Sequence, residues 1–555
     1  MVWRRIPASR SASTGACGAS LARGSSRKRH LVLLSCRPLR RPRAIDAVAG
    51  GTRFPIGPVT PKQVEAKLIS TDSSALSSPV QEHRSMRQPR AGTPLSRRQF
   101  VRSLAASVAT VPLAGGIGGS VATPARGASY ASQILGPGKR NAVFHWVDTA
   151  LQQIRDQRVL APRAAYNLGL ATAAGFLAAN GIARAYGEPF GIGTGPQDAD
   201  PEVAYGVAFS LAAAEAFQQP FLFERTSFLR RFSGSESKSL GVEWGRRAAM
   251  IVLGQRTDDG SEPSEVNYYL GRYERRGDTL QWSPTAPFYG ASPGPSFPSF
   301  ERCLYPGHGM ITPWTMKSGS QFRVSAFHDP RSPEFAEEFD MIRRLGGNDS
   351  TTRTADQSEV ALFWEDGPWG VTNPGHFMYI AMQLLQDRGL GFLELARAMA
   401  LVGMTQCDAS ISAWDSKYHY DVLRPETAIR ARAPEFGNPD SRVSVHGGWR
   451  SYIPTPEFPS YTSGHSTFGG AAAEMIALIH GRDDIAFSGR SPDQVLWPQL
   501  QGVTRHWTSL SHMAEENGMS RLYGGVHWAL DHVQGVAAGR AIARHAFRST
   551  FPNRS

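Results

Sequence analysis

Three short stretches in the last third of the chain carry residues that could together hold an oxyanion. They supply three cations, a hydroxyl, a small-residue turn and two histidines, one with a carboxylate four residues on. Such a set can bind a tetrahedral or trigonal-bipyramidal oxyanion and move protons on it. No phosphate-binding loop, nucleophile elbow or Cys/His metal motif elsewhere in the sequence competes with it. The residues are Lys417 with Arg424, the tripeptide Ser463-Gly464-His465, and Arg521 with His527 and Asp531.

The first stretch is predicted to present two cations from one helix. Lys417 and Arg424 are seven residues apart, so on a helix they project from the same face two turns apart. Pro425 then ends or kinks that helix. A solvated basic face is the ordinary alternative, but the residues between the two cations are too apolar for an exposed surface.

The second stretch is predicted to be a loop that enters a helix. Ser463 and Gly464 precede a run of small and apolar residues, Thr467 to Ile479, of helical type. Free backbone N–H groups and the helix dipole favour an anion at such a terminus, and glycine lets the backbone approach it closely. Taken alone, the stretch is equally typical of an ordinary loop with a capping serine.

The third stretch combines a turn with a histidine–carboxylate pair. Gly524 and Gly525 permit a turn that brings Arg521 and His527 to one point. His527 and Asp531 are four residues apart at the start of a predicted helix, so the carboxylate can accept from one ring nitrogen. The other nitrogen then keeps its lone pair for a ligand. Without the upstream arginine, such a pair is more often an ordinary helix contact.

The elements that must position these residues are predicted to be helical. Apolar residues recur at helical spacing through most of the chain after residue 139, and strand signals are short and few. One stretch differs, because Pro and Gly interrupt it every few positions without periodicity. We therefore predict an all-α protein of two helical bundles: an N-terminal bundle at 129–275, an irregular Pro/Gly-rich insert at 276–345, and a C-terminal bundle with the oxyanion site at 346–555.

The excess positive charge of the chain is concentrated in residues 1–128, which we call the leader. The formal net charge is +13, but residues 1–128 hold 21 Lys and Arg against four acids. The remaining residues hold 39 basic and 43 acidic side chains, so the folded part is mildly acidic. This distribution argues against nucleic-acid binding.

The leader is similar to a twin-arginine export signal. Arg97 and Arg98 precede an Ala/Gly-rich apolar stretch, and small residues suited to cleavage follow near Ala122 or Ala128. We expect residues 86–128 to be the signal of an exported protein, periplasmic or secreted. Translation is expected to begin at Met86 rather than Met1, with residues 1–85 an over-extended or unstructured leader. An organelle transit peptide and a basic turn before an N-terminal helix are the alternatives.

Two further features bound the class of protein. Cys303 and Cys407 are far apart and lack metal-ligand spacing, so we expect two buried thiols rather than a disulfide framework. Outside the leader there is no uninterrupted apolar run of the roughly 18 residues that a membrane-spanning helix needs. We therefore expect no integral membrane segment in the mature chain.

Taken jointly, the order and spacing of these positions resemble the signature of one superfamily. It contains the vanadium-dependent haloperoxidases, the type 2 phosphatidic acid phosphatases and the bacterial acid phosphatases. The closer resemblance is to the bacterial vanadium-dependent haloperoxidases, and it covers residues 345–550. It is carried by the three stretches and by the segments 350–357, 363–364, 413–420 and 520–527.

The resemblance implies a cofactor and a role for each residue. Vanadate would lie where the phosphatases bind phosphate, ligated by His527, which Asp531 would orient. His465 would act as acid and base, and a peroxovanadate on His527, polarised by Lys417, would oxidise halide to hypohalous acid. Asp356 would be a partner of an active-site arginine. The equatorial oxygens would be held by Lys417, Arg424, Arg521, the Ser463 hydroxyl and the Gly464 N–H.

The resemblance also implies the reagents. Hydrogen peroxide, a halide and a small organic acceptor would be the partners of the site. Trp414 and Phe458 resemble the aromatic pair that lines the halide pocket of chloroperoxidases, which favours chloride and bromide, although ordinary core packing explains two aromatics nearly as well. Helical members of this family often form dimers, which leaves a homodimer open.

Two other functions fit the same residues. In a soluble acid phosphatase His527 would attack a phosphoester to form a phosphohistidine, and His465 would protonate the leaving group. Phosphate can occupy the same site, so the motif alone does not separate the two enzymes. The third candidate is a catalytically silent anion-binding helical protein, which the complete set of acid, base and anchoring residues disfavours.

Overall fold

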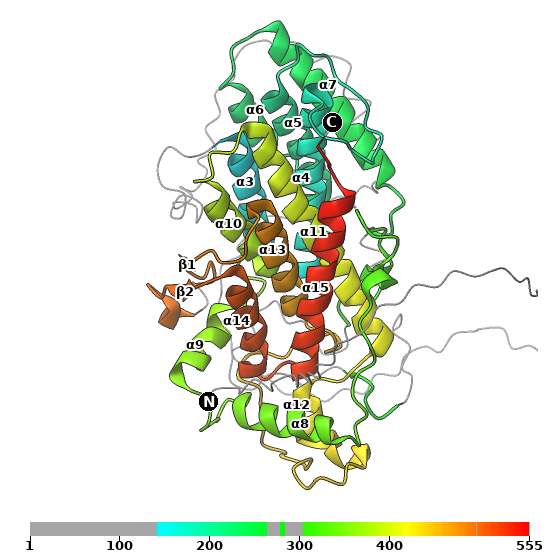
Figure 1. Cartoon of the computed structure of the whole chain (residues 1–555), viewed down its shortest axis with the longest axis vertical. Coiled ribbons are helices and arrows are strands. Elements are labelled where there is room, and N and C mark those ends of the chain that lie inside the picture. The colour runs from blue at the N-terminus through cyan, green and yellow to red at the C-terminus, as the bar shows by residue number, and fades with distance from the viewer. Residues whose placement is uncertain (1–140, 263–277, 284–302, 495–496, 554–555) are drawn as a thin grey trace, which may run out of the picture. The chain divides into compact units, whose positions relative to one another are not determined.

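The computed structural model describes residues 141–262, 278–283, 303–494 and 497–553. Over these ranges the protein is helical apart from two short strands, so the all-α prediction is confirmed (Figure 1). The predicted leader, twin-arginine signal and start at Met86 lie outside the described residues. The same holds for parts of the predicted insert, 284–302, and of the predicted N-terminal bundle, 129–140 and 263–275.

The first group of helices packs around a fully buried helix. Helix α4 consists mainly of small and apolar residues, and 20 of its 23 residues are buried. A helix that is apolar on all sides in this way is a central helix. Several neighbouring helices begin with a capping side chain or a proline. Asn141 Oδ1, for example, caps α3 by accepting from Phe144 N at 2.9 Å. The helices are α3 (Ala142–Gln157), α4 (Ala161–Ala183), α5 (Pro201–Phe217), α6 (Leu222–Leu229) and α7 (Glu236–Gln255).

The predicted irregular insert is irregular only in part. Residues 303–332 contain two short 3₁₀ turns, η2 (His308–Met310) and η3 (Gly319–Phe322). Helix α8 (Pro333–Leu345) follows, where no helix was predicted. Its start signal is local: the Ser332 hydroxyl accepts from Phe335 N at 3.2 Å, and a proline occupies the first helical position.

The second group of helices carries the predicted oxyanion site. One small antiparallel sheet accompanies it, with Phe487 of β1 (Phe487–Gly489) opposite Trp507 of β2 (Arg505–Trp507). The helices are α9 (Ala355–Phe363), α10 (Thr372–Leu385), α11 (Phe392–Tyr420), α12 (Pro425–Thr427), the π turn η4 (Ala428–Arg432), the 3₁₀ turns η5 (Ala433–Phe436) and η6 (Pro498–Leu500), α13 (Gly464–His480), α14 (Leu510–Tyr523) and α15 (Ala529–Ser549).

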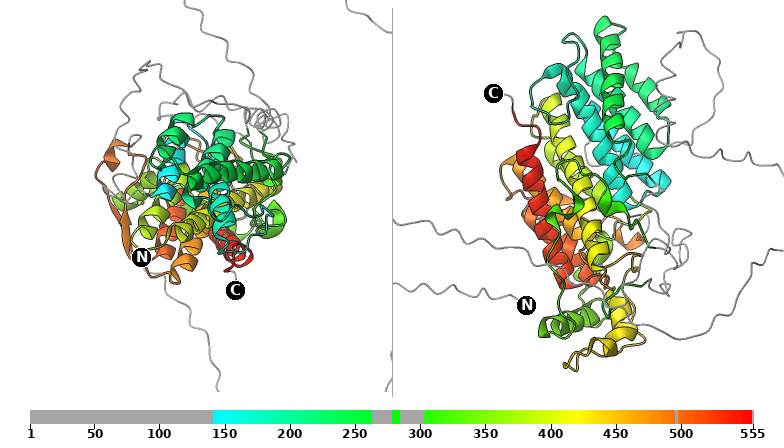
Figure 2. Two further views of the ribbon diagram at one scale, coloured as in Figure 1. Left: turned by 90° about the horizontal axis from the view of Figure 1, so that it is seen from above. Right: turned by 90° about the vertical axis from the view of Figure 1, so that its right-hand side faces the viewer.

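Helix α11 joins the two groups within the larger of two clusters of buried apolar residues. It packs against α4 on one side and α13 on another, and a single cluster of buried residues runs from Ala142 to Phe551 (Figures 1 and 2). The helices approach closely where a glycine meets a small side chain: a Cβ on Gly169 would lie 2.9 Å from that of Cys407. The C-terminal end of α11, which carries Lys417, is thereby held by packing along most of the helix.

The sulfur-containing side chains are mostly buried. Cys303 and Cys407 form no disulfide within the described ranges and have no exposed surface, as predicted. Met310, at the end of η2, is the exception among the described methionines, with 85% of its side chain exposed. Over the described ranges, no helix has the length and hydropathy required to cross a membrane.

Candidate active site

The structure brings the predicted oxyanion-binding residues to one place at the ends of five helices, α11 to α15. Lys417 lies in the last turn of α11, Arg424 directly precedes α12, and Arg521 lies in the last turn of α14. The prediction that Lys417 and Arg424 share one helix is wrong, because α11 ends at Tyr420 with Asp421 in the left-handed region, and Pro425 begins α12 instead of ending α11. Each of these three cations is at most 3% exposed. We call the following group the oxyanion cage: Lys417, Arg424, Ser463, Gly464, Arg521 and His527.

His527 is held in one tautomer by the carboxylate of Asp531. Its Nδ1 lies 2.6 Å from Asp531 Oδ2, which also accepts from the Ser460 hydroxyl and, at 3.1 Å, from Trp528 N. The proton of the neutral ring therefore sits on Nδ1, and Nε2 presents its lone pair toward the cage, 3.1 Å from Arg424 Nη1. The predicted pairing of His527 with Asp531 is present, and Ser460 adds a contact that sequence reasoning missed.

The cations are fixed by backbone carbonyl groups and keep donors unused. Lys417 Nζ donates to Pro459 O and Ser460 O at 3.0 and 2.8 Å. Arg424 donates to Phe458 O and Val526 O, both at 2.8 Å, and Arg521 donates to Trp364 O at 3.2 Å. Arg424 Nη2 and Arg521 Nε are buried without a hydrogen-bond partner among the described residues. Buried donors of this kind need an acceptor.

The electrostatics of the cage favour an anion. Burial, and then the charge of Arg424, hold the pKa of Lys417 well below its usual range. Burial lowers the pKa of Arg424 to about 9 and that of Arg521 to about 10. An oxyanion among these groups would offset both the lost hydration and the mutual repulsion. The cage therefore fits vanadate or phosphate in charge and in hydrogen-bonding capacity.

The second stretch adds a helix terminus, and α13 begins earlier than predicted. It starts at Gly464 rather than Thr467, because the Ser463 hydroxyl caps it by accepting from Ser466 N at 3.2 Å. The Gly464 N–H is thus the first of the helix, where a free donor favours an anion. His465 follows in the first turn, with Nε2 3.3 Å from Glu365 O. Burial, with a contribution from Arg521, holds the pKa of His465 well below its usual range, so the ring is neutral.

Sequence reasoning placed the acidic partner of the cage on the wrong residue. Asp356 lies in the first turn of α9 with its side chain 71% exposed, and it pairs with Arg505 at 3.0 Å rather than with a cage arginine. The carboxylates whose charge acts on Arg521 are Glu365 and Asp366. They lie at the start of the loop after α9, so the sequence signal was the acid pair directly after Phe363 and Trp364.

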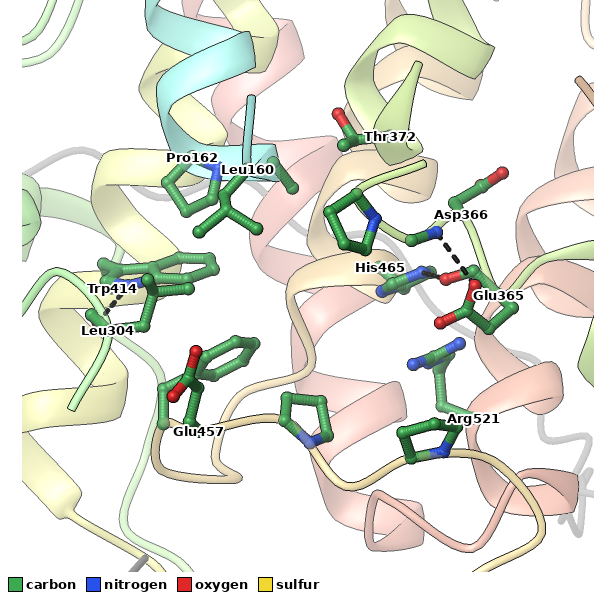
Figure 3. Close-up of a pocket in the computed structure, with 16 residues that line it drawn as sticks. Leu160, Pro162, Leu304, Glu365, Asp366, Thr372, Trp414, Glu457, His465 and Arg521 are labelled. Carbon is green, nitrogen blue, oxygen red and sulfur yellow. Dashed lines mark hydrogen bonds between the residues drawn. The ribbon is translucent and has the colours of Figure 1, made fainter. Parts of the chain in front are cut away.

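A cavity of about 110 Å³ lies beside the cage and is lined by the cage residue Arg521 and by His465 (Figure 3). Trp414 and Phe458, predicted to form a halide pocket, both line it, with ring centroids 5.0 Å apart. Lys417 Nζ lies 4.9 Å from the Phe458 ring centroid. The structure therefore places the aromatic pair next to the cage, with Lys417 Nζ over the face of the Phe458 ring.

Helix α8 lies next to the start of α15 (Figure 1). Glu338 Oε1 accepts from Leu530 N at 2.9 Å, and the rings of Phe335 and Phe339 lie 5.4 and 6.4 Å from that of Trp528. Glu338 Oε2 is buried without a hydrogen-bond partner in the described part of the chain. Burial, and then the charge of Asp531, raises the pKa of Glu338 to about 8.

Comparison with known proteins identifies one family of relatives. Residues 397–552 match the model of the VCPO second helical-bundle domain. Over 386 residues the chain is 26% identical to the vanadium chloroperoxidase of Curvularia inaequalis, covering 59% of this chain and 62% of the relative. The chain thus spans less than two thirds of the length of this curated relative.

Solved structures agree in fold. A structure described as the first bacterial vanadium-dependent iodoperoxidase superposes with a TM-score of 0.61 at 20% identity, covering 75% of this chain and 99% of that one. The apo form of a bacterial vanadium-dependent chloroperoxidase gives a TM-score of 0.54 at 17% identity, covering 69% and 92%. The resemblance predicted from the sequence is confirmed by these matches, and the fold is that of the vanadium-dependent peroxidases.

Proposed function

We propose that this protein is a vanadium-dependent haloperoxidase that oxidises halide with hydrogen peroxide to hypohalous acid. The observation that carries the proposal is the oxyanion cage, with buried cations and unused donors around the lone pair of His527 Nε2. The similarity to a vanadium chloroperoxidase and to bacterial vanadium-dependent peroxidases supports vanadate as the resident oxyanion.

Vanadate would be held by every member of the cage. His527 Nε2 would be its protein ligand, and the side chains of Lys417, Arg424 and Arg521 would neutralise its oxygens. The Ser463 hydroxyl and the Gly464 N–H would donate to it. When bound, vanadate supplies a Lewis acid that activates peroxide without a change in the oxidation state of the metal.

The side chains around the cage would handle the protons and the halide. Asp531 keeps the proton of His527 on Nδ1, which leaves Nε2 free to act as a ligand. His465 is neutral and lines the cavity, so it can take a proton from incoming hydrogen peroxide. Trp414 and Phe458 provide an apolar wall that strips water from a halide next to the Lys417 ammonium group. We propose chloride and bromide as the halides.

One paired assay tests this function against the phosphatase alternative. Purified protein is incubated with orthovanadate, hydrogen peroxide, bromide and a dye that changes colour on bromination, and in parallel with a chromogenic phosphoester. We expect bromination that requires vanadate and is inhibited by phosphate, because both oxyanions compete for one cage. Phosphoester turnover without bromination would establish the acid phosphatase, and anion binding without either activity would establish a silent protein.

Export is a separate proposal that the leader supports. We propose that the twin-arginine segment directs the protein out of the cytoplasm and is removed near Ala122 or Ala128. N-terminal sequencing of the native protein tests this, with a mature start after one of these residues expected. A mature start before Ser96 would contradict it.

A further inference from the structure

The first turn of α15 supports two members of the cage. Asp531 lies in this turn, and His527 stands two residues before the helix. The backbone oxygen of Asp531 also accepts from Ser463 N at 3.1 Å, so the residue that caps α13 rests on the same turn. A shift of this turn would therefore move His527 and Ser463 together.

Two carboxyl groups hold the backbone N–H groups at the start of α15. Asp531 Oδ2 accepts from Trp528 N at 3.1 Å. Glu338 Oε1, on α8, accepts from Leu530 N at 2.9 Å. Because these N–H groups have no backbone partner within the helix, such acceptors stabilise its first turn. Helix α8 also packs on the turn, with the centroid of the Phe335 ring 5.4 Å from that of Trp528. Glu338 is thus the acceptor by which a separate helix holds this turn in place.

The surroundings of the Glu338 carboxyl group disfavour a negative charge. Its Oε2 is buried without a hydrogen-bond partner in the described part of the chain, and an unpaired charge there would be costly. Among the described residues, the titratable groups that act on it are His328 from the segment before α8, Tyr461 from the segment before α13, and Asp531 from α15. His328 Nε2 lies 3.2 Å from Oε1, and the Tyr461 hydroxyl donates elsewhere, to Ser325 O at 2.7 Å. Burial, and then the charge of Asp531, raises the pKa of Glu338 to about 8, so below that pH the side chain is an uncharged acid.

From this arrangement we propose that Glu338 is a positioning residue of the oxyanion cage, whose uncharged carboxyl group holds the first turn of α15 without placing a second negative charge near Asp531. The proposal deepens the proposed function and rests on it for the identity of the resident oxyanion, vanadate. Ionisation of Glu338 would add a buried negative charge close to the His527–Asp531 pair. This charge would repel the bound oxyanion through a poorly screened interior, so the affinity of the cage would fall.

Phosphate binding tests the proposal without any redox chemistry. The dissociation constant of phosphate is measured by calorimetry for the wild type and for Glu338→Gln at about pH 6.5 and about pH 9, on either side of the Glu338 pKa. Glutamine keeps an oxygen acceptor for Leu530 N but cannot ionise. The ratio of the two constants at each pH cancels the titration of phosphate and of Arg424, because these are common to both proteins.

We expect the wild type and Glu338→Gln to bind phosphate equally at the lower pH. At the higher pH the wild type should bind about fivefold more weakly than the variant, because only the wild type gains a charge. A ratio that does not change with pH would overturn the proposal, since a purely structural contact does not depend on the charge of Glu338.

Asp340→Asn is the matched control on the same helix. The Asp340 carboxylate pairs with Arg343 and Arg344 at 2.6 and 2.9 Å, so this substitution also removes a negative charge from α8 but leaves the contact with α15 intact. We expect its phosphate affinity relative to wild type to be lower at the lower pH than at the higher pH by no more than the fivefold change that the wild type itself undergoes when Glu338 ionises. In other words, Asp340→Asn should follow the wild-type pH dependence, and a loss of that dependence would overturn the assignment to Glu338.

Glu338→Leu tests the hydrogen bond rather than the charge. It removes the acceptor of Leu530 N and should weaken phosphate binding about tenfold even at the lower pH, where the wild-type side chain is uncharged. Wild-type affinity in this variant would overturn the positioning role. The comparison of the wild type with Glu338→Gln remains decisive if the leucine variant does not fold.

The bromination assay separates the two proposals. If phosphate binds with the expected pH-dependent ratio but the vanadate-loaded wild type does not brominate the dye, the proposed function fails and the role of Glu338 in holding the cage stands. If the wild type brominates the dye but the ratio is the same at both pH values, the role of Glu338 is wrong and the haloperoxidase stands.

Discussion

Two buried histidine–aspartate pairs in this protein have nearly the same geometry and different surroundings. His527 Nδ1 lies 2.6 Å from Asp531, and His376 Nδ1 lies 3.0 Å from Asp366. The other ring nitrogen of His527, Nε2, faces cations, with Arg424 Nη1 at 3.1 Å. The His376 ring is instead stacked on Trp364 at 4.7 Å between centroids.

The difference shows that the pair alone does not make an anion site. In both pairs a carboxylate orients a buried imidazole, which satisfies Nδ1 and leaves Nε2 available. Several positive charges surround that nitrogen of His527, and they lower the pKa of the ring further after burial has done so. The surrounding cations, rather than the histidine–carboxylate contact, therefore identify the functional pair.

The largest expected effect comes from the same substitution at both histidines. His527→Gln should lower haloperoxidase activity by at least about a thousandfold, because the oxyanion loses its protein ligand. His376→Gln keeps a donor for Asp366 and should retain activity within a few fold, with a loss of stability of about 1–3 kcal/mol. Steady-state kinetics and denaturant unfolding of the two purified variants measure these effects. Comparable losses of activity would erase the distinction between the pairs.

A second test removes the charge of one cage arginine and compares the result with the same substitution at an arginine that is paired with carboxylates. Arg424→Met should weaken the binding of orthovanadate or phosphate about a hundredfold, measured by calorimetry. Wild-type affinity should also fall as the pH rises through about 9, the pKa to which burial lowers Arg424, because the neutral side chain no longer attracts the anion.

The matched control for that variant is Arg505→Met. Arg505 contacts Asp356, Glu359 and Glu516 at 2.6 to 3.0 Å, so its charge is already compensated. The control variant should bind oxyanions as wild type does and lose stability instead. If both variants bind with unchanged affinity, the cage is not the anion site.

The smallest expected effect concerns the buried carboxyl group next to the start of α15. In the folded protein Glu338 keeps its proton to about pH 8, above its ordinary value of 4.5. The folded state therefore binds more protons than the unfolded state between these values, so the free energy of unfolding should fall as the pH rises through this range. In the wild-type protein this fall in the free energy of unfolding should be on the order of 2–4 kcal/mol, and in Glu338→Gln it should be absent. Denaturant unfolding at a series of pH values measures both. Parallel pH profiles for the two proteins would contradict this.

The cage was predictable because local signals and spacing both point to it. A proline after Arg424, a capping serine before Gly464 and a glycine pair before His527 each end or begin an element at a functional residue. These signals act over a few residues, so they can be read without tertiary structure. Helix α8 has a similar start signal at Ser332 and Pro333, but the Pro- and Gly-rich stretch before it led to a prediction of irregular structure.

The partners of the cage were not predictable because packing decides them. Glu365 reaches Arg521 from a loop more than 150 residues earlier in the sequence, and Glu338 reaches the start of α15 from α8. Asp356 was chosen from its place in a family-like segment, yet the first turn of α9 faces outward, toward Arg505. No periodicity or spacing within a segment reports which distant element will pack against it.

The burial of Cys303 and Cys407 has a consequence for the proposed haloperoxidase, whose product would attack sulfur. Thiolates and thioethers are the side chains that oxidants modify first. Cys303 and Cys407 are inaccessible, and burial raises the pKa of Cys303 to about 11, so neither offers a reactive thiolate. Among the described methionines, Met310 is the most exposed, at 85%, so oxidation by the proposed product should begin there. The working lifetime of the enzyme would then depend on how completely the fold buries its cysteine and methionine side chains.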